Sequence, residues 1–395
     1  MIPEGWKTQR LGDVLEKVTR PVKVQSNQIY REIGVRSHAK GIFHKEHVTG
    51  EALGNKRVFW VEPHCLVLNI VFAWEQAVSE TNDRESGMIA SHRFPMYRPR
   101  DNRSNTTYLR YYFSSPRGKY DLELASPGGA GRNKTLGQAE FNNLKLLLPP
   151  PPEQEKIAKI LITWDKAIEK VEQLIEKSQE QKKALMQQLF TGEASHQFAR
   201  RHLRDIADID RHSLGTNTPD DFHFQYISLS DVSQGKISDH LHKHTFSDAP
   251  SRARKVVHSG DILLATVRPN LQSFARVYDD HEGFVASTGF SVITPHEKYH
   301  AGYIYHYLFG AHVSGQFHAL VVGSNYPAIN SSDVAGLLIY CPDFEEQHRI
   351  SKVLDAADST INSLIENKLA LQIEKKALMQ QLLTGKRRVS LSKEA

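Results

Sequence analysis

A glycine-rich stretch in the first half of the chain carries residue types that could hold a phosphate. Residues 128–135 read GGAGRNKT, close to a nucleotide-binding P-loop, but Asn133 replaces the second glycine and a poor strand precedes the motif. The same stretch suits a loop that faces DNA, because glycines let the backbone approach a phosphate while Arg132, Asn133 and Lys134 supply donors. An ordinary surface turn explains the pattern equally well.

Similar chemistry recurs in the second half of the chain. Residues 323–327 (GSNYP) give a loop with a glycine and a polar tip but no basic residue, and basic residues and an asparagine flank two predicted strands upstream. Arginine can read guanine and asparagine can read adenine in the major groove, although each alone is more often a solvated surface residue. These candidates are Arg252, Arg254, Arg268, Asn270, Asn325 and Tyr326.

Metal and catalytic chemistry find weaker support. His240, His242 and His244 lie on one face of a predicted strand, but a fourth zinc ligand is not evident and a solvated polar strand face is the simpler interpretation. We find no nucleophile elbow, zinc-protease motif or amino-methyltransferase motif. The sequence therefore favours a binding protein over an enzyme, and we expect no metal in this chain.

Composition sets the outer bounds. The chain has 395 residues, is 39% hydrophobic and carries a net charge of +5, which is compatible with a polyanionic partner. No apolar run is long enough to span a membrane, and the N-terminus does not resemble a signal peptide. Two cysteines in unrelated contexts suit a reducing compartment, so we expect a cytoplasmic protein.

One segment is repeated without change. Residues 182–189 (KKALMQQL) recur as residues 375–382, and each copy continues through one apolar residue to Thr-Gly. Core packing requires only apolar residues of suitable size, so identity over charged and amide residues indicates that both copies meet the same kind of partner surface. The predicted partner-binding residues are Lys182, Gln187, Gln188, Lys375, Gln380 and Gln381.

Each repeat ends a long predicted helix. Apolar residues alternate at steps of four and three from Ile157 to Leu189 and from Ile350 to Leu382, which is typical of a coiled-coil seam that includes Leu185 and Leu378. Prolines precede each helix and a glycine follows it. Because the two stripes are equivalent, we expect the helices to pair with each other; the alternative is that each packs only on its own domain.

The regions before the helices also correspond. Short strands and one short helix recur at nearly the same offset, which predicts an α+β fold with two pseudo-repeated globular domains joined by two long helices. The helix ends are nearly identical, whereas the domains share only a skeleton, so the domains present different surfaces. The predicted boundaries are 1–152, helix 153–193, 194–345, helix 346–386 and a disordered basic tail 387–395.

These features resemble the specificity subunit of type I restriction-modification systems. The resemblance rests on Pro3-Glu4-Gly5-Trp6, on the proline-rich entry to Glu153-Gln154 and its counterpart Glu346-Gln347, and on the KKALMQQL ending. It covers essentially the whole chain. The second half departs from the pattern, because residues 342–344 (PDF) replace the proline run and no Gly-Trp opening is present.

The resemblance implies a function and partners. Two target recognition domains would each read one half of a split double-stranded DNA site, and the two helices would form an antiparallel coiled coil that fixes their spacing. Two modification subunits, which carry S-adenosylmethionine and methylate adenine, would dock on this frame. Restriction subunits, which use ATP and Mg²⁺, would join them, so this chain would hold no cofactor itself.

We expect recognition to fall on loop residues of both domains. Arginine and lysine would contact phosphates or guanine, and asparagine would contact adenine. In the first domain the predicted residues are Arg36, His38, His92, Arg93, Arg132, Asn133 and Lys134; in the second they are Ser230, Arg252, Arg254, Arg268, Asn270, Asn325 and Tyr326.

Two other classes of protein remain open from the sequence. A coiled-coil adaptor that never meets DNA explains the helices and the duplication, but not the arginines on the loops of two diverged domains. A nuclease acting alone would need catalytic residues that we do not find. Salt-dependent DNA affinity separates the adaptor from a DNA-recognition protein, because phosphate contacts release counterions.

Overall fold

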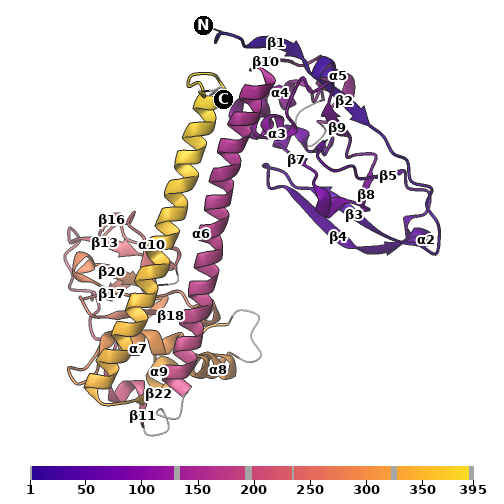
Figure 1. Cartoon of the computed structure of the whole chain (residues 1–395). Helices are drawn as coiled ribbons and strands as arrows, with labels where there is room; N and C mark the ends of the chain where they lie inside the picture. The colour runs from indigo at the N-terminus through magenta and orange to yellow at the C-terminus, as the bar shows by residue number, and fades with distance from the viewer. Residues whose placement is uncertain (1, 129–133, 192–197, 234, 322–326, 391–395) are drawn as a thin grey trace. The chain divides into compact units, whose positions relative to one another are not determined.

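The computed structural model describes residues 2–128, 134–191, 198–233, 235–321 and 327–390. The chain divides into two units: unit 1 comprises Met1–Val171 and Asn367–Ala395, and unit 2 comprises Glu172–Glu366. Each unit holds one globular domain and a part of each of two long helices (Figure 1). Within the described residues, no helix has the length and apolar character needed to cross a membrane.

Unit 1 contains ten short strands. They are β1 Lys7–Arg10, β2 Leu15–Val18, β3 Ile29–Val35, β4 Ile42–Thr49, β5 Val58–Trp60, β6 Leu66–Leu68, β7 Val78–Glu80, β8 Ile89–Ser91, β9 Met96–Pro99 and β10 Lys145–Leu148. They form two four-stranded sheets, β2-β9-β6-β7 and β4-β3-β8-β5, and the ladder β1-β10. The short helices are α1 Leu11–Val14, α2 Gly50–Leu53, α3 Thr106–Ser114, α4 Pro116–Leu124 and α5 Gln138–Asn143, with 3-10 turns η1 Ala73–Glu75 and η2 Asp83–Glu85.

Unit 2 repeats this order of strands. They are β11 Ala199–His202, β12 Ala207–Ile209, β13 His223–Ile227, β14 Val232–Ser233, β15 Lys236–Ile237, β16 His242–Thr245, β17 Ala253–Val256, β18 Ile262–Ala265, β19 Phe274–Arg276, β20 Val285–Ser287, β21 Phe290–Pro295 and β22 Leu338–Cys341. The sheets β12-β21-β18-β19 and β16-β13-β20-β17 and the ladder β11-β22 match those of unit 1, and β14-β15 is an addition. The helices are α7 Ala301–Leu308, α8 Ala311–Leu320 and α9 Ser331–Gly336, with 3-10 turns η4 Leu203–Asp205, η5 Leu229–Asp231, η6 Pro269–Leu271 and η7 Asp279–His281.

The register of the strands relates the two units residue by residue. Leu66 pairs with Tyr97 in the β6–β9 ladder, and Ile262 pairs with Ile293 in the β18–β21 ladder. Since both members of the second pair lie 196 positions after those of the first, equivalent positions can be read directly from the ladders. The prediction of a duplicated α+β domain is confirmed.

The two long helices are α6 Pro151–Thr191, with 41 residues, and α10 Phe344–Leu382, with 39 residues. Each begins two residues before its predicted boundary. For α6 the reason is that proline is tolerated in the first turn of a helix, where the backbone N–H has no intrahelical partner. The prolines at 151 and 152 therefore belong to α6 rather than preceding it.

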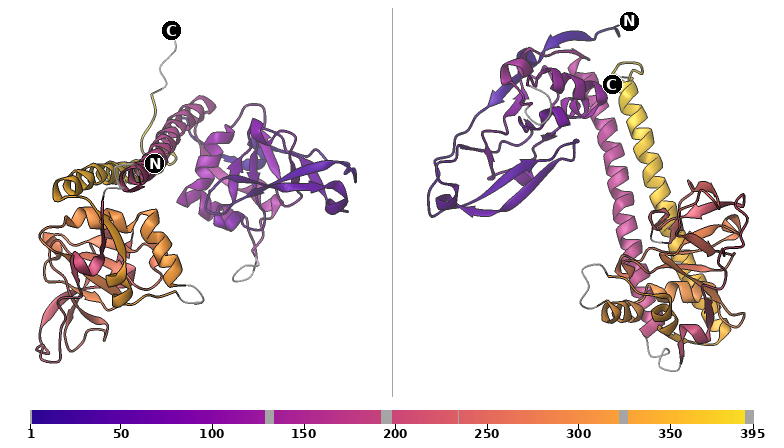
Figure 2. Two further views of the ribbon diagram at one scale, coloured as in Figure 1. Left: turned by 90° about the horizontal axis from the view of Figure 1, so that it is seen from below. Right: turned by 180° about the vertical axis from the view of Figure 1, so that it is seen from behind.

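The helices pair antiparallel within each unit. In unit 1, Ile157 and Leu161 from the start of α6 share a buried cluster with Leu382 from the end of α10. In unit 2, the end of α6 shares a cluster with Ile350 and Leu354 from the start of α10. The right-hand view of Figure 2 shows the two helices running alongside each other. Each cluster also includes residues of the adjacent domain, so the helices pack on each other and on their own domains.

A buried glutamine at the start of each helix ties the helix to its domain. Gln154 is fully buried, and its Oε1 accepts a hydrogen bond from the backbone N–H of Asn105, the N-cap of α3, at 2.9 Å. Its Nε2 donates to the carbonyl of Pro149 at 2.9 Å. Gln347 makes the same two bonds to His300 and Pro342, both at 2.9 Å. The repeated Glu-Gln pair in the sequence therefore has a structural role.

Part of the predicted disordered tail is ordered. Arg388 donates from Nε and Nη2 to Glu153, a carboxylate only 1% exposed, at 2.7 and 2.9 Å. Trp6 also donates to Glu153 from its indole Nε1 at 3.3 Å, and Val389 packs against the core of unit 1. The prediction of disorder was wrong for residues 387–390, because Arg388 is held in place where it neutralises a buried charge. Residues 391–395 lie outside the described part of the chain.

Candidate nucleic-acid interface and partner-docking helices

The β6–β7 loop (residues 69–77) is a structured turn rather than the end of a strand. The apolar run of residues 66–72 has the length and composition of one strand, but β6 ends at Leu68, where the Oδ1 of Asn69 accepts a hydrogen bond from Val71 N at 3.1 Å. Such side-chain bonds turn the backbone. Gln76 closes η1 in the left-handed region at φ 58°, and its Nε2 donates to the carbonyls of Phe113 and Ser115 at 2.9 and 3.1 Å.

Several predicted DNA-contacting residues of unit 1 gather around this loop. The turn between β3 and β4, which carries Arg36 and His38, is joined to it by a hydrogen bond from His38 N to Glu75 O at 2.6 Å. The turn between β8 and β9 is joined by a bond from Ile70 N to Arg93 O at 3.0 Å. The Nζ of Lys134 lies 5.5 Å from the ring centre of Trp74. Arg132 and Asn133 lie outside the described residues.

A hollow of about 550 Å³ lies between the β6–β7 loop and the turn from β8 to β9. Predicted His92 and Arg93 line it, together with Phe72, whose side chain is 39% exposed. The sequence analysis missed Phe72 because it counted as the last residue of a buried apolar strand. Other lining residues that it missed are Lys45, Lys56 and Asn69. Lys45 and Lys56 bond to Glu32, at 3.5 and 2.8 Å, so part of their charge is already balanced.

The β18–β19 loop (residues 266–273) holds the equivalent place in unit 2. It carries Arg268 and Asn270, both exposed, and Gln272 closes η6 at φ 53°, as Gln76 does in unit 1. Thr266 N donates to Gly289 O, and Thr288 N donates to Arg252 O, both at 2.8 Å, so Arg252 lies at the same surface. Left-handed residues other than glycine are uncommon and often mark functional loops.

The remaining predicted residues of unit 2 differ in how exposed they are, and two of them lie outside the described residues. Ser230 is exposed on η5, where the side chain of the neighbouring Leu229 faces Gly289. Arg254 is half-buried, with its guanidinium 4.8 Å from the ring centre of Phe246 and a bond from Nη1 to Ala253 O at 2.8 Å. These contacts direct Arg254 away from free solvent. Asn325 and Tyr326 lie outside the described residues, next to Pro327, whose carbonyl accepts from Arg268 N at 2.8 Å.

The two loops share a backbone and differ in chemistry. By the ladder register, Phe72 corresponds to Arg268 and Trp74 to Asn270, while Arg93 corresponds to Gly289. Arginine and asparagine can form bidentate hydrogen bonds with guanine and adenine, whereas an exposed phenyl ring suits the methyl group of thymine. Two equivalent loops with different side chains can therefore read different base sequences.

The repeated helix ends contain a reciprocal pair of ion pairs. Lys182 bonds Asp358 at 2.5 Å in unit 2, and Lys375 bonds Asp165 in unit 1. The two lysines are repeats of each other, as are the two aspartates, and the lysine side chains are 18% and 19% exposed. A docking role for Lys182 and Lys375 stays a prediction, and both ammonium groups are already engaged within the chain.

The repeated glutamines are placed differently. All four are exposed near the helix ends. Gln187 lines a largely apolar hollow of about 420 Å³ that Met186 and Phe190 also line, and Gln381 lines another of about 760 Å³ beside Trp164 and Leu378. Amide groups at the edge of apolar hollows suit a protein partner. The exposed residues are Gln187, Gln188, Gln380 and Gln381.

The ionisable groups under the helices differ between units. In unit 1, the Tyr111 hydroxyl donates to Asp165 at 2.5 Å. The equivalent residue of unit 2 is His306, fully buried and 2.9 Å from Asp355, with Asp358, Lys182 and Arg276 nearby. Burial lowers the pKa of His306, while hydrogen bonds from His306 and Arg276 hold the pKa of Asp355 well below its usual range.

Metal and thiol chemistry receive no support from the described residues. No group of three or more histidine, cysteine or acidic side chains lies close enough there to hold a metal ion. The rings of His242 and His244 stand 6.5 Å apart, and His244 packs edge-on against Tyr226. Burial raises the pKa of the Cys65 and Cys341 thiols to about 12, so neither is a nucleophile at neutral pH.

Comparison with known proteins agrees with this architecture. The family model for the type I restriction modification DNA specificity domain matches twice, over residues 3–177 and 198–375. Two specificity subunits from Methanocaldococcus jannaschii, those of type I restriction enzyme MjaVIII and of putative type I restriction enzyme MjaX, are 23% and 24% identical to this chain. Each alignment covers 98% of this chain and 94% or 95% of the relative.

A solved structure shares the fold across the whole chain. The S subunit of a type I restriction-modification system from M. genitalium matches with a TM-score of 0.61 at 12% identity, covering 96% of each chain. Together with the two family matches, which fall on the two halves of the duplication, this places both globular domains and both helices in one known architecture. The chain therefore belongs to the family of type I restriction-modification DNA specificity proteins.

Proposed function

We propose that this chain is the DNA-specificity subunit of a type I restriction-modification complex. The single observation that carries the proposal is that two matches to the specificity domain coincide with two equivalent loops on one backbone frame, which present different side chains. Each domain reads one half of a bipartite double-stranded site. In unit 1 the reading surface comprises Phe72, His92, Arg93 and the turn of Arg36; in unit 2 it is centred on Arg268 and Asn270.

The paired helices fix the separation of the two half-sites and dock the modification subunits. Support for docking comes from the exposed repeated glutamines beside apolar hollows, while the lysine–aspartate pairs hold the helices together. The modification subunits supply S-adenosylmethionine and adenine methylation and recruit the restriction subunits, which use ATP and Mg²⁺. This chain is the non-catalytic reader of the complex.

Selection from random duplexes tests the proposal. The full chain is mixed with its modification subunits, and bound duplexes are recovered and sequenced. We expect two short fixed blocks at a constant gap. Replacing residues 194–345 with the corresponding domain of another family member should change one block only, and a change in both would contradict independent domains. Failure to bind any duplex, while the complex still assembles, would favour a protein adaptor.

A further inference from the structure

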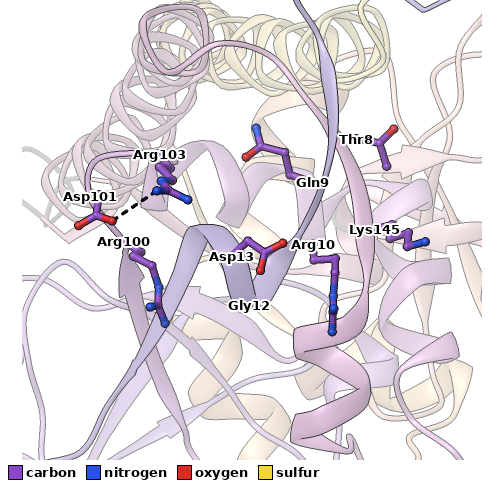
Figure 3. A pocket seen from close by; sticks show the side chains of 9 residues that line it. All are labelled: Thr8, Gln9, Arg10, Gly12, Asp13, Arg100, Asp101, Arg103 and Lys145. Carbon is purple, nitrogen blue, oxygen red and sulfur yellow. Dashed lines mark ion pairs between the residues drawn. The ribbon is translucent and has the colours of Figure 1, made fainter.

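A second basic surface lies in unit 1, on β1, α1, the segment after β9 and the start of β10. It surrounds an open hollow of about 710 Å³ (Figure 3). The charged residues that line it are Arg10, Arg100, Arg103, Lys145, Asp13 and Asp101. Four cations thus face two carboxylates, and all six residues are exposed. We call these six residues the β1–β10 patch.

Part of the positive charge is unbalanced. Arg103 lies 3.8 Å from Asp101, and Arg10 donates to Asn143. Within the described ranges, no ion pair engages Arg100 or Lys145. Their charged ends remain available in a hollow that is open to solvent, which suits an anionic ligand larger than a single ion.

The patch is separate from the β6–β7 loop but within reach of the same duplex. Strand β9 has Arg93 just before it and Arg100 just after it, so the two arginines are at most about 25 Å apart along an extended chain. That length corresponds to roughly seven base pairs of duplex. A duplex that is read at the β6–β7 loop and runs along β9 would therefore bring its flanking backbone to the patch.

Unit 2 has the same backbone at this place. Arg100 N donates to Val14 O at 2.8 Å, and the equivalent His296 N donates to Ile206 O at 2.9 Å. Of the six charged positions of the patch, Asp13 alone keeps its identity, as Asp205. Three exposed arginines on β11 and η4 instead occupy the positions equivalent to Thr8, Gln9 and Gly12, which also line the hollow of unit 1. These are Arg200, Arg201 and Arg204.

The helix ends and the β1–β10 patch differ in how far their residues are repeated between the two units. The helix ends keep eight residues unchanged, as expected where two copies of one protein partner require the same geometry. At the β1–β10 patch and the equivalent place in unit 2, exposed arginines are present in both units but at different positions. A phosphate backbone requires charge and tolerates varied geometry, whereas a protein surface does not.

We infer that the β1–β10 patch binds the sugar-phosphate backbone of duplex DNA that flanks the half-site read by unit 1. The three exposed arginines of unit 2 do the same beside the other half-site. This inference rests on the proposed function, because it places additional contacts on the same duplex. These contacts add affinity and salt dependence without adding sequence preference.

The test uses the full chain assembled with its modification subunits. Binding to a duplex with the selected site, and to one with scrambled half-sites, is measured over a series of salt concentrations. The variant R100A/R103A/K145A removes three cations of the patch, and D13N/D101N removes its two carboxylates at the same place. Arg10 is left unchanged because it bonds to Asn143.

The triple variant should weaken binding to both duplexes alike. It should also reduce the slope of log K against log salt by about 0.9 for each phosphate that the patch no longer neutralises, so by up to about 3. D13N/D101N should act in the opposite direction. Repeating the random selection with the triple variant should return the same two blocks. Circular dichroism and thermal unfolding confirm that both variants are folded.

Two outcomes overturn the inference. One is an unchanged slope and affinity in the folded triple variant. The other is weaker assembly with the modification subunits at an unchanged slope, which would make the patch a protein contact. Failure of the proposed function has a different signature, because the unmodified complex would then select no split site at all.

Discussion

Tyr111 in unit 1 and His306 in unit 2 occupy the same position under the helix pair, and each lies beside one of the repeated aspartates. Tyr111 donates to Asp165, which also pairs with Lys375. His306 bonds Asp355 and lies 3.9 Å from Asp358. Asp358 in turn pairs with Lys182. The contacts that join the helices are repeated, whereas the residue beneath them has changed. The two halves of the chain thus share the pairing of the helices and differ in the residue that lies beneath it.

The same division extends to the DNA-facing loops. The buried glutamines at the helix starts make identical bonds in both units, and the left-handed Gln76 and Gln272 close equivalent turns. In the same loops, the position that is Phe72 in unit 1 is Arg268 in unit 2. A loop that ends on a residue held in the left-handed conformation can therefore change its exposed side chains without loss of the fold.

The largest effect on stability should come from the two buried glutamines at the helix starts. Gln154→Ala and Gln347→Ala each leave a backbone N–H and a carbonyl without their partner, so we expect each to lower the free energy of unfolding by about 2–4 kcal/mol. Urea denaturation followed by circular dichroism measures this. Gln173→Ala, on an exposed face of α6, is the matched control and should change stability by less than about 0.5 kcal/mol. A large loss from one buried glutamine alone would break the equivalence of the units.

Arginine substitutions in the loops should separate the two half-sites. Arg93→Ala should weaken binding to the selected site by about 10- to 100-fold and relax preference in one block, and Arg268→Ala should do so in the other block. Competition binding with duplexes mutated in one block at a time measures this. Arg84→Ala, an exposed arginine on η2, is the control. If either substitution relaxed both blocks, the division of reading between the units would be wrong.

Acid should affect unit 2 more than unit 1. The folded-state pKa of His306 lies below its unfolded value, so the unfolded chain binds more protons as pH falls through the usual histidine range. Stability of unit 2 should therefore decrease between pH 7 and pH 5, and the buried histidine's share of that decrease should disappear in His306→Gln. Hydrogen exchange resolves the two units. Equal loss of protection in both, unaltered by the substitution, would contradict a role for His306.

The smallest effect should come from the reciprocal ion pairs. Each pair is partly exposed, so Asp165→Asn and Asp358→Asn should each cost about 1 kcal/mol or less. The charge-swapped variant D358K/K182D should recover most of the loss in unit 2. Thermal unfolding of the single and double variants gives the coupling. A coupling near zero would show that these repeated residues were kept for a partner and not for pairing.

Sequence reasoning reached the frame because periodicity and repetition report it directly. The helices and the strand order by halves follow from local patterns that the fold repeats. Arg36, His38 and Arg93 were named separately as candidates on loops, and a DNA contact by any of them stays a prediction. Phe72 could not be found, because an apolar residue after a strand gives the same signal whether the chain continues or turns at Asn69. The ion pairs of Lys182 and Lys375 were also hidden, because their partners lie on the other helix, far away in sequence.

The position of Arg388 and Leu382 affects the order in which the protein can form during synthesis. Unit 2 is continuous from Glu172 to Glu366, so no later segment of the chain is needed to complete it. Unit 1 begins the chain, yet its core includes Leu382 and Leu383, and its buried Glu153 is neutralised by Arg388. Of the two globular domains, the one that is translated earlier is therefore completed later, and until then it exposes an apolar strip and an uncompensated charge to any chaperone or protease nearby.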